Sequence, residues 1–159
     1  MIDNRLARTA LLCLQAFVGV TAVAGGGALM IGSLDPGLAT AITPSPEYLR
    51  GSPFSSYLVP GAVLAIVLGG VHLLSFAWLL RRQRWALLAA AVAAFDTLIW
   101  IFVQMIIIPF SVLQAVYFTA GLAEVGFLLL LLGVTRAAAP THSAARAIDD
   151  RADQGTITL

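Results

Sequence analysis

The sequence is that of a strongly hydrophobic protein, since 60% of its 159 residues are hydrophobic and only 11% are charged. A soluble domain typically has about 25% charged residues, and the apolar excess here lies in long uninterrupted runs, which predicts a membrane protein. The formal net charge of +1 argues against a nucleic-acid partner, and the single cysteine, Cys13, excludes both an intramolecular disulfide and a two-cysteine redox centre.

Four apolar runs are each long enough to form a membrane-spanning helix. In chain order they cover residues 9–31, 57–80, 85–109 and 112–134. Runs of about 22–25 residues cross a hydrocarbon core of about 30 Å, and in lipid the backbone must be helical to satisfy its hydrogen bonds. The sequence therefore predicts an all-α, integral membrane four-helix bundle that occupies residues 1–136.

The distribution of arginine predicts the orientation of these helices. All nine basic residues are arginine, and eight of the nine lie on one side of the membrane if the N-terminus is cytoplasmic, which leaves only Arg50 outside. The eight are Arg5, Arg8, Arg81, Arg82, Arg84, Arg136, Arg146 and Arg151. This bias places both termini in the cytoplasm. Because the absence of lysine is typical of GC-rich bacterial genomes, we expect a multi-pass protein of a bacterial inner membrane.

The connecting segments differ in length and composition. Residues 33–56 form an outer segment with four prolines, Pro36, Pro44, Pro46 and Pro53, which predicts an extended or turn-rich loop. The connection around residues 109–111 is so short that the last two helices should be antiparallel neighbours. The polar tail, residues 137–159, should be a mobile cytoplasmic segment.

Small residues recur at helical spacing on the first two helices. They are Gly19 and Gly26 on the first helix, and Gly61, Ala65 and Gly69 on the second. Small residues on one face let two helices approach closely in a bilayer. We interpret both faces as packing surfaces inside the bundle, although the same pattern would also suit an interface with another subunit.

Three ionisable residues fall at similar depths on three different helices. Asp96 and Glu124 each lie twelve positions from the arginine at the cytoplasmic end of their helix, which is about 18 Å at 1.5 Å per residue. His72 is nine positions from Arg81, about 4–5 Å shallower, and shares a face with the small residues of its helix. The pattern predicts an intramembrane polar cluster of His72, Asp96 and Glu124.

This predicted cluster has a cost that calls for an explanation. An acidic residue at the centre of a membrane helix costs about 2.5–3.5 kcal/mol on insertion scales, so such residues face inward and pair or line a wet cavity. Two adjacent carboxyls cannot both be ionised cheaply, so at least one should be protonated near neutral pH. The cluster could fix helix register, form a binding cavity for a lipid, an amphipathic small molecule or a proton, or act in acid–base catalysis.

Further polar and aromatic residues extend the faces that carry the two acids. They are Trp100 and Gln104 after Asp96, and Gln114 and Tyr117 before Glu124. Together they predict a cavity lining that runs from the middle of the membrane toward the outside. The three ionisable residues His72, Asp96 and Glu124 form no known metal or nucleophile motif. A histidine with two carboxylates could bind a divalent metal, but this spacing is not diagnostic of a metal site, so we expect no metal and no cofactor.

Several short motifs between Arg50 and Leu131 resemble a known group of proteins. They are Gly51-Ser52-Pro53-Phe54, the stretch from Tyr57 through Pro60-Gly61 to Gly69-Gly70, Trp100-Ile101 with Gln104, Leu113-Gln114, Tyr117-Phe118 and Gly121-Leu122. The chain resembles a loose group of small, uncharacterised bacterial integral membrane proteins with four helices. The resemblance implies the helix count and brings no established activity.

The sequence leaves three classes of function open. The small mass outside the membrane favours a non-enzymatic role as an accessory subunit or lipid-associated module of a larger envelope or lipid-transport assembly. Its partners would then be membrane lipid and other membrane-protein subunits, or a second copy of the chain. The alternatives are a proton-linked transporter or a lipid- or small-molecule-binding protein built on His72, Asp96 and Glu124, and an intramembrane acid–base enzyme using the same residues.

Overall fold

The computed structural model describes residues 4–133, and these residues form helices and turns without a strand. The predicted tail, residues 137–159, lies outside the described residues. In chain order the elements are α1 (Asn4–Leu34), α2 (Pro36–Ile42), the 3-10 helix η1 (Pro46–Leu49), α3 (Leu58–Val63), the π-helix η2 (Leu64–Gly69), α4 (Gly70–Leu80), α5 (Ala86–Ile107) and α6 (Val112–Leu131).

Four helical segments are long and apolar enough to cross a membrane, which confirms that part of the prediction. They are Asn4–Leu34, Leu58–Leu80, Ala86–Ile107 and Val112–Leu131. The second consists of α3, η2 and α4 in succession. The first begins and ends a few residues beyond the predicted run, because neither its polar start nor its glycine-rich end interrupts the helix.

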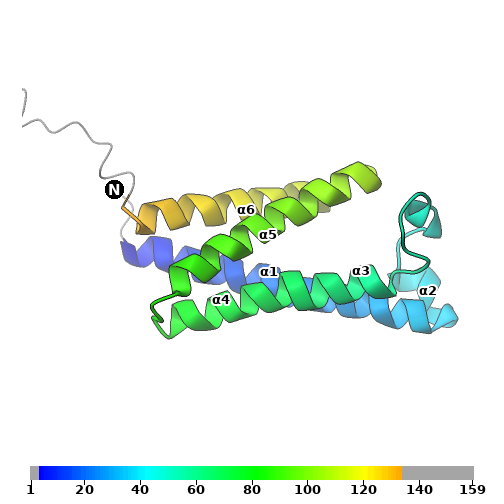
Figure 1. Cartoon of the computed structure of the whole chain (residues 1–159), viewed down its shortest axis with the longest axis horizontal. Helices are drawn as coiled ribbons and strands as arrows, with labels where there is room; N and C mark the ends of the chain where they lie inside the picture. Colours follow the sequence, from blue (N-terminus) through cyan, green and yellow to red (C-terminus); the bar gives the residue numbers. More distant parts are fainter. Residues whose placement is uncertain (1–3, 134–159) are drawn as a thin grey trace, which may run out of the picture.

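Successive long segments run in opposite directions (Figure 1). The first segment, α1, packs against α3, η2 and α4 on one side and against α6 on the other, while α5 packs against both α4 and α6. The start of α1 and the end of α6 therefore lie at the same end of the molecule (Figure 1). In this arrangement α4 and α6 lie diagonally opposite each other.

Glycines allow α1 to approach the second segment closely. A Cβ atom added to Gly26 would collide with the carbonyl oxygen of Gly61 and lie only 2.6 Å from the backbone nitrogen of Ala65. Similarly, a Cβ atom on Gly69 would lie 2.6 Å from a side-chain methyl of Val23. The small residues predicted from their spacing thus lie at the contact between these helices, where larger side chains would force the backbones apart.

The outer segment is more helical than its prolines predicted. Asp35 caps α2 by accepting a hydrogen bond from the backbone N–H of Gly37 at 2.8 Å, and Pro36 is the first residue of this helix. Ser45 and Pro46 begin the 3-10 helix in the same way. Proline favours the first turn of a helix, because its φ is already suitable and its missing N–H would have no partner there.

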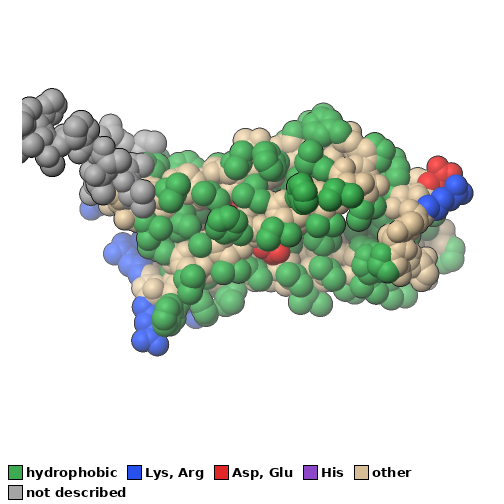
Figure 2. Space-filling model, turned by 45° about the horizontal axis from the view of Figure 1, so that its top comes forward, with side chains coloured by type: hydrophobic (Ala, Val, Ile, Leu, Met, Phe, Trp, Pro, Cys, Tyr) green, Lys and Arg blue, Asp and Glu red, His purple; other side chains and the backbone are tan. Residues whose placement is uncertain are grey.

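Most charged side chains gather at the two ends of the molecule, and the surface between them is mainly apolar apart from an acidic side chain near its middle (Figure 2). The arginines at positions 5, 81, 82 and 84 are exposed at one end, where α1 begins and α4 ends. At the other end, Arg50 lies 3.7 Å from Glu47 and both side chains are exposed. Such a band of exposed hydrophobic side chains suits contact with lipid tails.

Candidate functional site

A layer of buried polar side chains lies between two apolar clusters. The cluster nearer the arginine-rich end contains Leu11, Leu79, Ala86, Ala90 and Leu128, and the other contains Val18, Ala22, Leu68 and Ala120. On α1, the second segment and α6, the polar residues occupy the turns between these clusters, and on α5 Thr97 lies between Ala90 of the first cluster and Trp100, which packs against the second. The polar layer consists of Gln15, His72, Ser75, Thr97 and Glu124, and none of these residues has measurable exposed surface.

His72 is held by hydrogen bonds on both sides of its ring. Its Nδ1 lies 2.7 Å from the backbone carbonyl oxygen of Leu68, one turn earlier on the same segment. A carbonyl oxygen only accepts hydrogen bonds, so Nδ1 must carry a proton. On the opposite side, Nε2 lies 3.0 Å from the hydroxyl oxygen of Thr97 on α5. These two contacts fix the orientation of the imidazole.

Glu124 approaches the same imidazole from the diagonally opposite helix. Its carboxyl oxygen Oε2 lies 3.4 Å from His72 Nε2, and both side chains are completely buried. An isolated buried charge is very costly, so the pair is stable either as imidazolium with carboxylate or as neutral imidazole with carboxylic acid. In both arrangements the pair carries one proton in addition to the proton on Nδ1. This proton is on Nε2 in the ionic arrangement and on the Glu124 carboxyl group in the neutral one.

The Thr97 hydroxyl is placed to respond to the position of that proton. It lies 3.0 Å from His72 Nε2 and 3.4 Å from the backbone carbonyl oxygen of Ala93. When the imidazole is neutral, Nε2 has one lone pair, and the hydroxyl and the Glu124 carboxylic acid are alternative donors to it. When Nε2 carries a proton, the hydroxyl can donate to Ala93 and accept from the ring, because a hydroxyl is both donor and acceptor.

Other polar groups of the layer have unused hydrogen-bonding capacity. Both amide atoms of Gln15, the hydroxyl of Ser75 and both carboxyl oxygens of Glu124 are buried without a hydrogen-bond partner within residues 4–133. Buried polar groups normally find partners, and leaving one without a partner costs about 1–3 kcal/mol. These groups from α1, α4 and α6 are therefore suited to bind water or a small polar species.

Asp96 is the least integrated member of the predicted cluster. It is close enough to His72 for an electrostatic interaction, but within the described residues no hydrogen bond joins them. The side chain is partly exposed, and its Oδ2 is buried without a partner. The structure thus brings His72 and Glu124 into contact and leaves Asp96 beside them.

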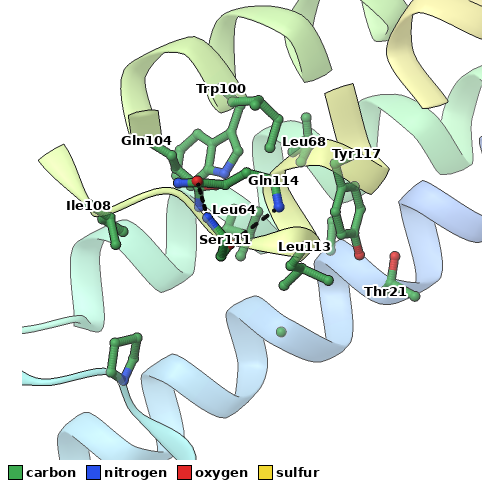
Figure 3. Close-up of a pocket in the computed structure, with 14 residues that line it drawn as sticks. Thr21, Leu64, Leu68, Trp100, Gln104, Ile108, Ser111, Leu113, Gln114 and Tyr117 are labelled. Atoms are coloured by element: carbon green, nitrogen blue, oxygen red, sulfur yellow. Dashed lines mark hydrogen bonds between the residues drawn. The ribbon is translucent and has the colours of Figure 1, made fainter. Parts of the chain in front are cut away.

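A cavity of about 310 Å³ (Figure 3) lies on the side of the polar layer away from the arginine-rich end, and we call it and the cavity that adjoins it the outer cavities. Its wall includes all four residues predicted to line a cavity, Trp100, Gln104, Gln114 and Tyr117. Polar groups face it from several elements, and the side chains of Tyr117 and Thr21 point toward each other at one edge (Figure 3). The cavity therefore combines an aromatic wall with hydrogen-bonding groups.

The start of α6 fixes Gln114 on this wall. The hydroxyl of Ser111 accepts from the backbone N–H of Gln114 at 3.3 Å, and the Gln114 side-chain oxygen accepts from the backbone N–H of Ser111 at 2.9 Å (Figure 3). This reciprocal capping box ends the short connection from α5 and begins α6. Because its oxygen is used in the cap, the amide nitrogen of Gln114 is the group with capacity for a further partner.

A second, more apolar cavity of about 270 Å³ adjoins the first. The two share Pro44, Trp100, Gln104 and Ile108 as lining residues. The remainder of the second wall is mostly hydrophobic and includes Leu29, Leu49, Phe54, Val63 and Ile107. The paired cavities thus offer one compartment with several hydrogen-bonding groups and one more strongly apolar compartment, and they share Trp100 and Gln104.

Leu68 connects the outer cavity to the polar layer. Its side chain lines the first cavity, and its backbone carbonyl is the acceptor for His72 Nδ1. Leu68 belongs to the π-helical stretch η2, as does Leu64, another lining residue. Short π-helical stretches are frequent at functional sites. No residue of the polar layer itself lines either outer cavity.

The sequence did not identify Thr97, Ser75 and Gln15 as members of the polar layer. Ser75 is one turn from His72 on the same face, so its spacing carried a usable signal. Thr97 follows Asp96 directly, and the more strongly polar neighbour concealed it. Within residues 4–133 no three metal-ligating side chains gather in a way that could hold a metal ion.

Comparison of the chain with known protein families, curated proteins and solved structures finds no match. The resemblance noted from the sequence motifs therefore gives no evidence about function. Functional inference for this chain rests on the geometry of the polar layer and the outer cavities.

Proposed function

We propose that this chain is an inner-membrane protein of a bacterium, in which four helices form a bundle with both termini in the cytoplasm. The exposed arginines at the end where α1 begins and α4 ends support this orientation. On this arrangement the paired cavities lie in the outer half of the bilayer, and the polar layer lies deeper.

Within this frame the chain is a binding protein for an amphipathic small molecule or lipid. The observation that carries this proposal is the pair of adjoining cavities, which share Trp100 and Gln104 and differ in polarity. A polar group of the ligand would bond to Gln104 and the amide nitrogen of Gln114, and an apolar chain would occupy the second cavity. Ligand sites commonly combine an apolar wall with a few placed polar groups.

The polar layer serves this protein in a different way from the cavities. Because His72 and Glu124 are fully buried and line neither outer cavity, a ligand bound there would not touch them. This separation favours binding over intramembrane acid–base catalysis. The pair would hold one proton and fix the register of α4 against α6, and Leu68 offers a route by which its state could influence the cavity.

Retention of ligands by the purified protein tests the proposal. The full-length chain would be extracted gently from its native membrane, and the retained lipids and small molecules identified by mass spectrometry. We expect one enriched amphiphile, whose amount falls about tenfold in Trp100→Ala and Gln104→Leu variants, since each removes a major contact. The matched control is Phe102→Ala on the same helix, because Phe102 is 64% exposed and lines neither cavity.

Equal retention in all three variants, or no enriched molecule in the parent protein, would contradict the binding proposal. Helix content and thermal stability of each variant, measured in detergent, separate loss of the site from loss of the fold. The single Phe102 control also reports how far any large-to-small change on α5 affects retention by itself.

A second candidate function is an accessory subunit of a larger envelope or lipid-transport assembly. The observation that favours it concerns Gly27, Gly70 and Gly126, where an added Cβ would meet no atom within 4 Å. These glycines serve no close packing inside the described chain, whereas small residues on an outer helix face permit a partner helix to approach. Crosslinking in native membranes should then capture a subunit in fixed proportion, and Gly126→Leu should abolish the crosslink without lowering stability.

A further inference from the structure

A cavity of about 750 Å³ lies at the arginine-rich end of the molecule, far from the outer cavities. Its wall comes from the start of α1, the end of α4, the turn that follows, the first turn of α5 and the end of α6. We call it the basic cavity; its principal lining residues are Arg5, Arg8, Arg82, Gln83, Leu12 and Leu87. Nothing in the proposed ligand site or the polar layer makes use of it.

The described lining of the basic cavity carries several positively charged side chains. Three arginines line it, and no aspartate or glutamate within residues 4–133 does so. Arg8 and Arg82 form no ion pair with any residue in that range. The first turn of α5, which has no side-chain cap, adds the partial positive charge of its backbone N–H groups. An anion entering the cavity would therefore meet cationic groups from three elements.

Arg8 has a structural role that uses only part of its hydrogen-bonding capacity. Its Nη2 donates to the backbone carbonyl of Leu79 at 2.5 Å, which joins the start of α1 to the last turn of α4. This contact holds the guanidinium against the cavity wall. A guanidinium has five N–H donors in a planar fork that suits phosphate, so the bond to Leu79 leaves donors for a ligand.

Arg82 occupies a backbone position that normally favours glycine. Its φ is +53°, and the N–H groups of Arg82 and Gln83 bond back to the carbonyls of Leu79 and Trp78 at 3.2 and 3.0 Å. This pattern is a Schellman motif, whose left-handed residue is usually glycine. An arginine in this conformation is strained. The retained side chain, which lines the cavity, is a functional reason for tolerating that strain.

The cavity also has an apolar side. Leu12, Leu87 and Leu131 line it, each from a different membrane-spanning segment. A freely soluble anion would gain nothing from these leucines, whereas a lipid phosphate would carry acyl chains that cover them. We propose that the basic cavity binds the phosphate headgroup of an anionic phospholipid from the leaflet on the arginine-rich side. Basic recesses between membrane helices are suited to such headgroups.

Native mass spectrometry of the full-length chain tests this inference. The protein would be released from nanodiscs of phosphatidylcholine with a minor fraction of phosphatidylglycerol, and retained lipids counted. We expect phosphatidylglycerol to be retained in preference to phosphatidylcholine, and Arg82→Gln to lower that retention about tenfold, as expected for one lost charge-assisted contact. The matched control is Arg84→Gln, which removes the same charge from the same turn, although Arg84 is stacked on Trp85 and does not line the cavity.

Two further measurements keep the outcome unambiguous. Arg82→Gly relieves the backbone strain, so it should raise the melting temperature and still lower retention, which unfolding cannot explain. Inorganic phosphate added to delipidated protein should neither raise the melting temperature nor displace phosphatidylglycerol. If Arg82→Gln and Arg84→Gln lower the retention of phosphatidylglycerol equally, general attraction to a basic surface explains the binding and the proposal is overturned. If phosphate alone raises the melting temperature and this effect depends on Arg82, the cavity binds a soluble anion and the proposal is also overturned.

Discussion

His72 Nε2 lies 3.4 Å from Glu124 Oε2, and this contact joins two helical segments that lie diagonally opposite each other. Neighbouring segments pack mainly through small residues and apolar side chains, with polar contacts such as that of Thr97 with His72, whereas the diagonal pair meets through side chains that reach the centre. A buried polar contact of this kind is costly when it is misaligned, so it specifies register more than it adds stability.

The protonation of His72 is the first property that can be measured. Because the Leu68 carbonyl only accepts, we predict that Nδ1 carries a proton in every state of the folded protein. Nitrogen-15 NMR of labelled histidine in detergent should show either the Nδ1–H tautomer or imidazolium. A neutral Nε2–H tautomer of His72 would contradict the prediction, and the spectrum of a His72→Gln variant assigns the signal.

The stability of a Glu124→Gln variant also distinguishes the neutral arrangement of the His72–Glu124 pair from the ionic one. Glu124→Gln preserves shape and supplies an amide that can donate to Nε2. If the native pair is neutral, this change should alter stability by less than about 1 kcal/mol, because it replaces one neutral polar group with another of the same shape. If the native pair is ionic, the variant would leave an unpaired imidazolium, and the loss should approach the roughly 3–5 kcal/mol of a broken buried pair.

The sequence predicted the position of the ionisable residues along their helices better than the rotation of each helix about its own axis. Depth follows from counting residues from the arginines, so the count alone places Glu124 and His72 at similar levels in the membrane. The rotation of α5 is decided by its small residues, since Ala90, Ala93, Ala94 and Thr97 form its buried face. Asp96 is one residue away from Thr97, or about 100° around the helix, and is therefore left partly exposed.

Two other features could not be predicted for physical reasons. The prolines of the outer segment were compatible with either a loop or the start of a helix. The side chains of Asp35 and Ser45 cap the first turns that follow them, and these caps stabilise the helical form. The adjoining cavities depend on how far α5 and α6 stand from α1 and the outer segment, a distance that no local pattern encodes. The four lining residues were identifiable because they share faces with the two acids.

Close packing at Gly26 should make this position intolerant of any side chain. In Gly26→Ala the new Cβ would lie 2.8 Å from Ala65 Cβ and collide with backbone atoms of the second segment. We predict a loss of about 1–3 kcal/mol, the usual cost of overpacking. The adjacent control is Gly27→Ala, whose Cβ would meet nothing within 4 Å and should stabilise the helix by about 0.5–1 kcal/mol. Denaturation in mixed detergent micelles measures both, and similar effects at the two positions would contradict the packing argument.

Tyr57 should make the outer segment sensitive to alkaline pH. Burial, and secondarily the nearby Tyr48, raise the pKa of Tyr57 above its ordinary value of 10.0, and its hydroxyl donates to the Ser45 carbonyl at 2.7 Å. Above the ordinary pKa the unfolded chain loses this proton while the folded chain keeps it. Stability is therefore unaffected below that pH and falls as the pH rises toward the folded pKa.

Ultraviolet absorbance of tyrosinate, compared between the parent protein and Tyr57→Phe, measures this titration. The difference spectrum should show a tyrosine that ionises later than a free one. At neutral pH the free energy of unfolding of the variant should be about 1 kcal/mol lower, because the hydrogen bond to Ser45 is lost. At alkaline pH the variant should not show the fall in stability that ionisation of Tyr57 causes in the parent protein. Ionisation of Tyr57 at or below the ordinary pKa would show that the residue is not enclosed as described.

The left-handed backbone of Arg82 predicts a stabilising substitution in a charged surface turn. Because its φ is +53°, Arg82→Gly should raise the free energy of unfolding by about 1 kcal/mol through relief of strain. The neighbouring control, Arg81→Gly, has an ordinary φ of −82° and should lower stability, since glycine there only adds freedom to the unfolded chain. Thermal unfolding of both variants and the parent protein in the same detergent measures these two changes in stability. If Arg82→Gly is no more stable than the parent protein, the arginine side chain must contribute contacts that offset the strain, and lipid extraction before unfolding would show whether bound phospholipid supplies them.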